Sequence, residues 1–308
     1  MAQETLVVKL RRDEGEELRR KLSEGAFEFR SVPHALFSAK GEGVVATLYG
    51  SGKLVVQGSD ARGFLLRFLE REPPAPSAST SGAKSGDGPG EALVEELERA
   101  PLVGSDEAGK GDWFGPLVVA AVRVEPEDAA RLRAGGVMDS KRLSDRRVLE
   151  MAGGLRARFA HAVARLDPAD YNRAHEQLGN LNPLLARLHG QAIRAVARGD
   201  EAILIDRFAD EALMRSELAE LPNIESRLHQ IPRGERAMAV AAASVLARAA
   251  FLEGLSELSA EVGVELPKGA GAPVDAAGRA LLALHPRERL REVAKLHFRN
   301  TSKLAGRR

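Results

Sequence analysis

The first 72 residues alternate between apolar and polar positions in a way that predicts a small sheet with two helices. Residues 4–10, ETLVVKL, show the period of two that is typical of a strand, and residues 13–25 form an amphipathic helical stretch that ends at a glycine. Further strands and a closing helix are predicted at residues 27–39, 43–50, 53–58 and 59–72. The order β-α-β-β-β-α predicts an antiparallel sheet with both helices on one face.

Residues 73–90, PPAPSASTSGAKSGDGPG, interrupt this pattern because they contain no large apolar residue. Such a segment cannot bury a core, and its composition is typical of a flexible linker. We therefore predict an N-terminal domain at residues 1–72, a linker at residues 73–90 and a larger C-terminal domain at residues 91–308.

The C-terminal part alternates between apolar runs and helical patterns. The runs at residues 102–107, 116–124 and 202–206 predict buried strands. Helices are predicted at residues 91–100, 126–134, 144–158, 180–198 and 238–258. The last of these helices is rich in small residues, which lets it pack tightly against a sheet. The layout predicts the α/β class.

Composition narrows the class of protein. The chain has 308 residues, of which 44% are hydrophobic and 29% charged, with a formal net charge of +1. The absence of cysteine excludes disulfides and cysteine-ligated metals. We find neither a secretory signal nor an apolar run near the ~18 residues that span a bilayer, so we expect a cytoplasmic protein, without a membrane partner, that is a monomer.

The segment VGSDEAGKGDWFGP, residues 103–116, allows two interpretations. Gly104 to Lys110 fits G-x-x-x-x-G-K, most of a phosphate-binding P-loop. A P-loop then requires Ser or Thr, where this chain has Gly111, and Asp106 and Glu107 would repel the phosphates. These differences make the P-loop the weaker interpretation.

The alternative is that Asp106 and Glu107 bind metal. Carboxylates are preferred ligands of Mg²⁺, and two such ions about 4 Å apart catalyse phosphodiester hydrolysis. Neighbouring residues of a strand point to opposite faces, so these two acids share a site where the strand breaks. We expect that break at Ala108–Gly111.

Further motifs carry a family resemblance. GSDEAGKGDWFGP resembles the first motif of the type 2 ribonucleases H, and its Trp113-Phe114 pair points to ribonuclease HIII. Other segments resemble family motifs in the same order: ATLYGSGKLVVQG (46–58), MDSKRLSD (138–145), GNLNPLLARLHGQAI (179–193), ILIDRFA (203–209), AVAAASVLARAAFL (239–252), LPKGAGAPVD (266–275) and KLHFRNTSK (295–303). The resemblance therefore covers nearly the whole chain except the linker.

The resemblance implies a ribonuclease-H-like domain with a central mixed sheet, preceded by a domain similar to half of the TATA-binding protein. It implies endonucleolytic cleavage of the RNA strand of RNA–DNA hybrids, with two Mg²⁺ or Mn²⁺ ions held by four carboxylates. Asp106, Glu107 and Asp206 match the first three. Glu235 fits the fourth, although it lies one residue closer to the Ala-rich segment than the family pattern, and Glu225 is the nearest other acid.

The same resemblance suggests substrate contacts. Gly109-Lys110-Gly111 would place backbone groups against ribose hydroxyls, and Ser140 and Lys141 are candidates for the substrate backbone. Tyr49 and Lys53 would face nucleic acid from the N-terminal sheet, as would Lys9 and Arg30. The histidines at positions 175, 189 and 297 lack the clustered spacing of a zinc site, and we interpret them as structural, with His297 a minor candidate near substrate.

Two alternatives to this function stay open beside the P-loop enzyme. One is ribonuclease HII-type cleavage at single ribonucleotides in DNA, which the N-terminal domain and a glutamate as fourth acid disfavour. The other is a non-catalytic nucleic-acid-binding protein, which the four carboxylates disfavour.

Overall fold

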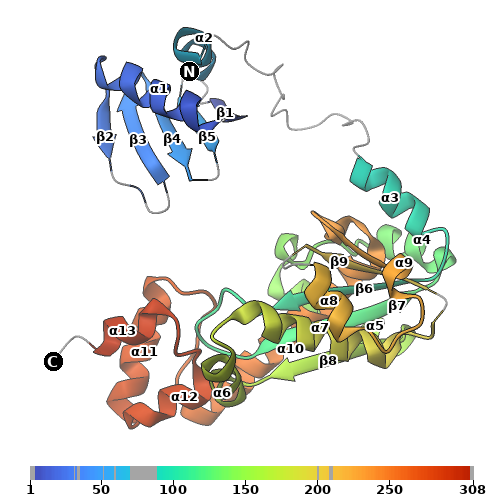
Figure 1. Ribbon diagram of the computed structural model, residues 1–308. Coiled ribbons are helices and arrows are strands. Elements are labelled where there is room, and N and C mark those ends of the chain that lie inside the picture. The colour runs from blue at the N-terminus through green and yellow to red at the C-terminus, as the bar shows by residue number, and fades with distance from the viewer. Residues whose placement is uncertain are drawn as a thin grey trace. The chain divides into compact units, whose positions relative to one another are not determined.

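The chain forms two compact units, Met1–Ser85 and Gly86–Arg308 (Figure 1). The computed structural model describes residues 4–30, 32, 35–50, 52–58, 60–69, 89–199, 201–207 and 211–305. Nearly all of the predicted linker lies outside these residues, so its flexibility stays a prediction.

The N-terminal unit is a five-stranded antiparallel sheet with helices on one face (Figure 1). Its elements are β1 (Glu4–Lys9), α1 (Arg12–Ser23), β2 (Glu28–Arg30), β3 (Ala35–Gly41), β4 (Val44–Tyr49), β5 (Lys53–Gly58) and α2 (Ala61–Leu69). The strand order is β1-β5-β4-β3-β2. Residues 27–39 were predicted as one strand, and they contribute to two, β2 and β3. A proline, which has no N–H to donate to a ladder, stands between the two in the sequence.

The sheet face away from the helices is partly open to solvent. Along β4, Val44, Ala46 and Leu48 are buried while the intervening residues are half-buried, Tyr49 among them. Lys53 begins β5 as an exposed residue and is paired with Lys9 of β1. The alternation therefore places Tyr49 and the two lysines on the open side.

The C-terminal unit is built on a five-stranded mixed sheet, as the family resemblance implied. Its order is β10 (Leu228–Ile231), β9 (Ala202–Asp206), β6 (Leu102–Ala108), β7 (Leu117–Val124) and β8 (His161–Leu166). Strand β6 is parallel to β9 and antiparallel to β7. The three inner strands match the predicted apolar runs. The edge strands β8 and β10 were not predicted, because β10 has only four residues and most of β8 is not buried.

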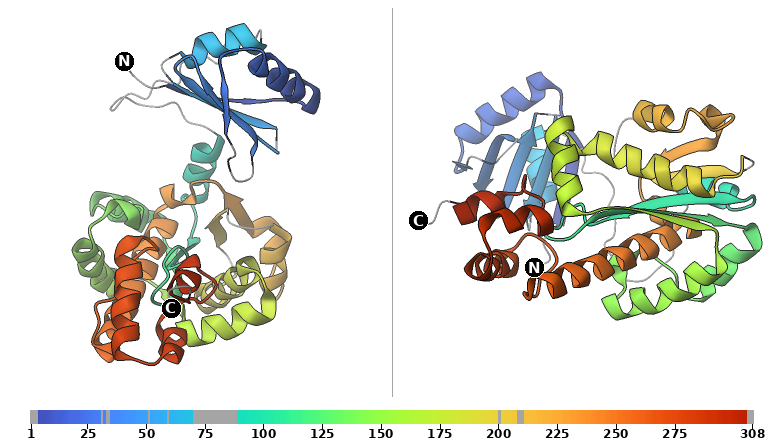
Figure 2. Two further views of the ribbon diagram at one scale, coloured as in Figure 1. Left: turned by 90° about the vertical axis from the view of Figure 1, so that its left-hand side faces the viewer. Right: turned by 90° about the horizontal axis from the view of Figure 1, so that it is seen from below.

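Helices cover both faces of this sheet (Figure 2). They are α3 (Pro89–Leu97), α4 (Pro126–Ala134), α5 (Asp145–Arg158), α6 (Pro168–Leu178), α7 (Leu181–Val196), α8 (Glu211–Glu217), α9 (Ile224–Arg227), α10 (Met238–Val262), α11 (Ala272–Leu284), α12 (Leu290–Val293) and α13 (Arg299–Ala305), with 3₁₀ turns η1 (Ser140–Arg142), η2 (Gly234–Arg236) and η3 (Arg287–Arg289). Helices α10, α5 and α4 share one core with the sheet, and α7 belongs to a second core on the opposite face.

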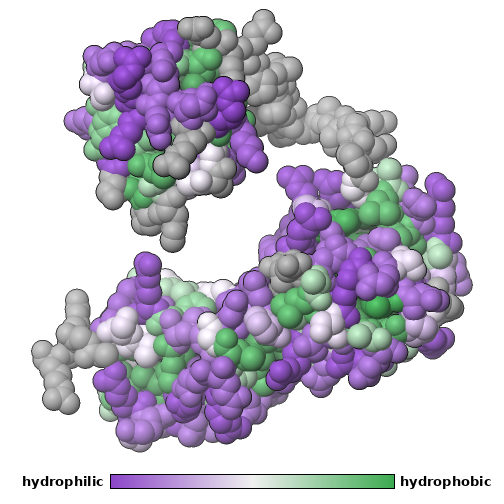
Figure 3. Space-filling view, in the orientation of Figure 1, coloured by the Kyte–Doolittle hydropathy of each residue, from purple (hydrophilic) through white to green (hydrophobic). Residues whose placement is uncertain are grey.

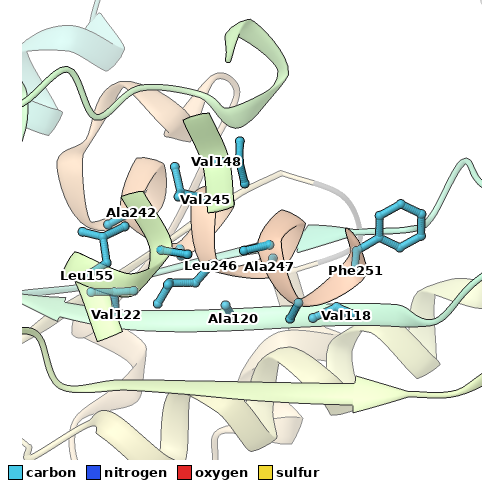
Figure 4. Packing of buried hydrophobic residues seen from close by; sticks show 14 of the residues in the cluster. Val118, Ala120, Val122, Val148, Leu155, Ala242, Val245, Leu246, Ala247 and Phe251 are labelled. Carbon is cyan, nitrogen blue, oxygen red and sulfur yellow. The ribbon is translucent and has the colours of Figure 1, made fainter. Parts of the chain in front are cut away.

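Helix α10 lies directly against β6 and β7 (Figure 4). A Cβ added to Gly104 of β6 would lie 2.2 Å from the carbonyl carbon of Ala239 and from the amide nitrogen of Val240. Farther along the helix, Ala242 and Ala247 are fully buried in the core that α10 shares with α5 and the sheet (Figure 4). Two backbones thus meet at Gly104, where only a hydrogen atom separates them.

By length and composition α10 could also cross a membrane, which the predicted absence of an apolar run did not anticipate. In the folded chain 83% of its most apolar window is buried. The face of the protein seen in Figure 3 is largely hydrophilic, with separate apolar patches. The burial identifies α10 as the core helix of the unit, and a long apolar helix in such a position is weak evidence for a membrane span.

Gly104→Ala should destabilise the C-terminal unit by about 1–3 kcal/mol, because the new methyl group must displace the backbone of α10. The matched control is Gly153→Ala in α5, where an added Cβ meets nothing within 4 Å and should stabilise by about 0.5–1 kcal/mol. Urea unfolding followed by the fluorescence of Trp113, the single tryptophan, reports on this unit. Equal stabilities of the two alanine variants would contradict the close contact.

Candidate active site

Two of the predicted acids lie at neighbouring strand ends. The parallel register pairs Gly104 with Leu204 and Ser105 with Ile205, so Asp106 and Asp206 follow one step later on adjacent strands. Strands in a sheet lie about 4.8 Å apart, which brings these two carboxylates together. They open into a groove of about 860 Å³, lined by Asp106, Glu107, Ala108, Gly109, Lys110, Gly111, Asp112, Ser140, Lys141, Asp206, Arg207, Arg248, Phe251 and Lys268.

Asp106 points toward α10. Its carboxylate accepts a hydrogen bond from the backbone amide of Glu107 at 2.8 Å and interacts with the hydroxyl of Ser244 on α10. Burial and the negative charge of Glu107 raise the pKa of Asp106 to about 7, and these effects outweigh the hydrogen bonds. The raised pKa means that the surrounding protein groups do not fully compensate the negative charge of Asp106.

Glu107 points to the other side of the sheet, toward α7. Its Oε2 lies 3.5 Å from Nε2 of His189, and its Oε1 lies 3.3 Å from Nζ of Lys110. Burial acts to raise the pKa of Glu107, but His189 and Lys110 outweigh it and lower that pKa to about 2. The two adjacent acids therefore have very different surroundings.

The expected strand break occurs within the predicted segment, because β6 ends at Ala108 and a turn follows at Gly109–Gly111. Strand β6 continues through both acids and remains paired with β7 up to Ala108. The neighbouring strand β9 ends at Asp206, and its pairing with β6 stops at Ser105. The last residues of β6, Asp106, Glu107 and Ala108, therefore line the groove from both faces of the strand.

Asp206 is held by backbone amides. Its Oδ1 accepts from the amide of Arg207 at 3.0 Å and from the amide of Gly234 at 3.4 Å. A Cβ on Gly234 would lie 3.1 Å from the backbone nitrogen of Asp206, so the η2 turn packs tightly on the end of β9. Glu235 follows Gly234 directly in the sequence, so it lies one residue from the contact with Asp206, although it is not among the groove-lining residues.

Glu225 lies at the opposite end of the sheet. It belongs to α9, before β10, whose last residue Ile231 is the one paired with Asp206. Glu225 comes six positions before Ile231 in the sequence. The exposed carboxylate of Glu225 forms an ion pair with Arg215. The parallel register therefore favours Glu235 over Glu225 as the fourth acid.

No three His, Asp or Glu side chains approach closely enough to enclose a metal ion in the described part of the chain. Repulsion between like charges explains this spread, since carboxylates without a cation between them are most stable when they turn apart. Glu107 lines the groove while its two carboxylate oxygens face His189 and Lys110.

Comparison with known proteins identifies the family. The family model described as Ribonuclease HII matches residues 103–301, and one described as Domain of unknown function (DUF3378) matches residues 5–81. Ribonuclease HIII of Protochlamydia amoebophila (strain UWE25) is 36% identical over 94% of this chain and 93% of its own length. Ribonuclease HIII of Exiguobacterium sibiricum is 38% identical over 88% of this chain and 87% of its own length. The chain belongs to the ribonuclease HIII family.

A solved structure agrees with this assignment. Bst-RNase HIII in complex with Mn²⁺ has a TM-score of 0.66 and 35% identity, over 99% of this chain and all of that one. A ribonuclease HIII is a nuclease of the ribonuclease H type, so the chain is a phosphodiester hydrolase of a metal-dependent family. The ribonuclease HII-type and non-catalytic alternatives are not favoured, because the ribonuclease HIII relatives match both units.

The fold also excludes the P-loop. A P-loop opens a helix whose first turn binds phosphate, whereas Gly109–Pro116 connects β6 to the antiparallel strand β7. This loop is held by the buried Lys295, which donates to the carbonyls of Asp112 at 3.0 Å and Gly115 at 2.6 Å. Burial lowers the pKa of Lys295 to about 7.

Gly109 is required by the path of the loop, and Gly111 is not. Gly109 has φ +85°, and a Cβ there would lie 2.1 Å from the carbonyl oxygen of Pro116. At Gly111 a Cβ would meet nothing within 4 Å, so the missing side chain leaves the backbone accessible from the groove. Lys110 between them is exposed and faces Glu107.

The DSK segment, residues 139–141, borders the groove and is connected to α10 by polar contacts. Ser140 is buried, and its hydroxyl lies 2.8 Å from that of Ser244, so its side chain faces α10. Arg248 donates to the carbonyl of Ser140 and pairs with Asp145 at 2.6 Å, and Lys268 pairs with the same carboxylate. Lys141 is the exposed member of the predicted pair.

Sequence reasoning missed several residues at this site. Ser244, Arg248 and Lys268 stand within segments that resemble family motifs, so the signal was present. His189 was interpreted as structural because it lacks the clustered spacing of a zinc site, and the structure shows that it contacts Glu107 and Ser105. The predicted Tyr49 and Lys53 belong to the other unit and do not line this groove.

Asp106→Asn should stabilise the metal-free protein in a pH-dependent way. The Asp106 carboxyl titrates near pH 7 in the folded chain and near pH 4 when unfolded, so wild-type stability falls as pH rises from about 4 to about 7. Asparagine does not titrate and avoids this loss. We expect a gain of roughly 1–3 kcal/mol at pH 8 and little gain at pH 4, measured by urea unfolding with EDTA.

The control for this prediction is Asp128→Asn, which removes a surface ion pair with Arg131 and should change stability by less than about 1 kcal/mol at either pH. A gain for Asp106→Asn that is equal at pH 4 and pH 8 would show that the Asp106 pKa is not raised.

Proposed function

We propose that the groove at the ends of β6 and β9 is the active site at which this chain hydrolyses the RNA strand of RNA–DNA hybrids, leaving 5′-phosphate and 3′-hydroxyl ends. The supporting observation is the juxtaposition of Asp106 and Asp206 on adjacent parallel strands. Glu107 follows Asp106, and Glu235 follows the glycine whose amide donates to Asp206. Such a concentration of negative charge at a strand end has no structural purpose of its own and is costly without a cation.

The donor set fits a hard divalent cation. Asp106, Glu107, Asp206 and Glu235 offer carboxylate oxygens, which Mg²⁺ and Mn²⁺ accept, and the raised pKa of Asp106 marks a negative charge that lacks compensation. We propose that these four residues hold two ions. When bound, such ions supply Lewis acidity at the phosphate and a more acidic water.

The residues around the acids would position the hybrid. The glycines on both sides of Lys110 let the backbone approach a ribose, whose 2′-hydroxyl is both donor and acceptor and so distinguishes RNA from DNA. Lys141, Arg248 and Lys268 line the same groove and provide positive charge for backbone phosphates. Asp145 orients the last two, since it contacts both.

The open face of the N-terminal sheet is proposed as a second contact with the hybrid. Tyr49, Lys53 and Lys9 share that face, which combines an aromatic ring with cations, as nucleic-acid-binding surfaces do. A tethered second contact raises the effective concentration of substrate at the groove. The cytoplasmic location and the monomeric state stay predictions.

Glu235→Gln should lower kcat on an RNA–DNA hybrid by at least about 100-fold, since loss of a ligand exceeds the 10–100-fold cost of losing an outer partner. Glu225→Gln is the matched control, because it makes the same change at the far end of the sheet and breaks only a surface ion pair. Cleavage is measured with Mg²⁺ or Mn²⁺ on a continuous hybrid and on a duplex with one ribonucleotide.

For that assay, equal losses in the two glutamine variants would remove Glu235 from the metal site. Cleavage confined to the single-ribonucleotide duplex would overturn the proposed substrate.

Lys53→Glu should raise KM for a long hybrid several-fold and leave kcat nearly unchanged, because it removes a phosphate contact remote from the chemistry. The slope of log binding constant against log salt should become shallower by about 1. Arg19→Glu makes the same reversal of charge on the exposed surface of α1, on the helical side of the same unit, and serves as the control. A similar change in KM for both variants would show that the open sheet face has no specific role.

A further inference from the structure

A buried chain of hydrogen-bonding groups runs from β7 to His189. The hydroxyl of Ser105 donates to the carbonyl oxygen of Ala120 at 2.9 Å, and the same oxygen lies 2.7 Å from Nδ1 of His189. Ser105 and His189 are both 0% exposed. A hydroxyl has a single proton, and here Ala120 takes it. Nδ1 of His189 is therefore the donor to Ser105, which fixes the orientation of the ring. Nε2 donates to Glu107 at the same time when the ring carries a proton on both nitrogens.

The other ring nitrogen faces Glu107. Nε2 of His189 lies 3.5 Å from Oε2 of the glutamate, across the interior of the sheet face that α7 covers. The second oxygen of Glu107 faces Lys110, whose side chain is 41% exposed and belongs to the loop after β6. Of these two neighbours, the buried ring is the rigid one. Strands β6 and β7 and helix α7 together determine where it lies.

We propose that His189, oriented by Ser105, is a positioning residue that sets the direction of the Glu107 carboxylate toward the metal site. This inference rests on the proposed role of Glu107 as a metal ligand. The ring acts as a buried support: it does not touch the substrate, and it limits the orientations from which Glu107 can turn toward the groove. Groups that orient metal-binding side chains in this way commonly contribute 10–100-fold to metal affinity.

Two substitutions separate this role from simple packing. His189→Gln can present a donor near the position of Nε2, whereas His189→Asn places its amide near Nδ1 and reaches only Ser105. We measure Mn²⁺ binding to the full-length protein without substrate, by calorimetry and by the electron paramagnetic resonance of free Mn²⁺. We expect His189→Asn to bind Mn²⁺ at least about 10-fold more weakly and His189→Gln to stay within about threefold of wild type.

Ser105→Ala tests the orienting contact and remains informative if a His189 variant does not fold. It should weaken Mn²⁺ binding at least about twofold, and the Ser105→Ala/His189→Asn double variant should bind no more weakly than His189→Asn alone. His161→Asn, on the edge strand β8, is the control for loss of an imidazole and should leave Mn²⁺ binding unchanged.

Three results would overturn the inference: wild-type Mn²⁺ affinity in His189→Asn, equal losses in the Asn and Gln variants, or wild-type affinity in Ser105→Ala. Glu107→Gln separates this failure from that of the proposed function. If Glu107→Gln keeps full Mn²⁺ affinity, the glutamate is not a ligand and the proposed metal site fails. If Glu107→Gln loses affinity while His189→Asn does not, only the positioning role fails.

Discussion

The contact between Gly104 and the first turn of α10 determines the geometry of the whole site. Because only a hydrogen atom separates β6 from the backbone of Ala239 and Val240, the helix axis lies as close to the sheet as two backbones allow. Ser244 then reaches Asp106, two residues beyond Gly104, and Arg248 reaches the DSK segment one turn later. A larger residue at Gly104 would move all of these groups together.

The pleat of β6 distributes the two adjacent acids between different environments. Asp106 faces α10, where a serine hydroxyl and a backbone amide are its partners, and burial together with the charge of Glu107 outweighs these contacts and the attraction of Lys141. Glu107 faces α7, where His189 and Lys110 stabilise its charge. The pKa values move in opposite directions for this reason. In the absence of metal, Asp106 is therefore the carboxylate that takes up a proton first as the pH falls.

Local patterns in the sequence predicted the inner strands and the long helices of the C-terminal unit. The inner strands were visible because burial on two faces leaves continuous apolar runs such as residues 117–124. The motifs located Asp106, Glu107 and Asp206. The sequence could not reveal that His189 lies against Glu107, since 84 residues separate His189 from Ser105, its other partner. The sequence correctly placed the end of β6 within residues 108–111, but it could not show that the pairing with β9 stops before Asp106.

The parallel register of β9 and β10 favours Glu235 over Glu225 as the proposed fourth acid, a choice that spacing along the chain leaves open. Glu225 precedes β10 and Glu235 follows it. Because β10 is parallel to β9, the two glutamates lie toward opposite ends of the sheet. Since β9 delivers Asp206 at its carboxyl end, the acid that follows β10 is the one beside it. The η2 turn shortens the path from β10 to α10, and the Gly234 amide ties that turn to Asp206. A chain one residue shorter than the family pattern can thus still bring its glutamate to the same strand end.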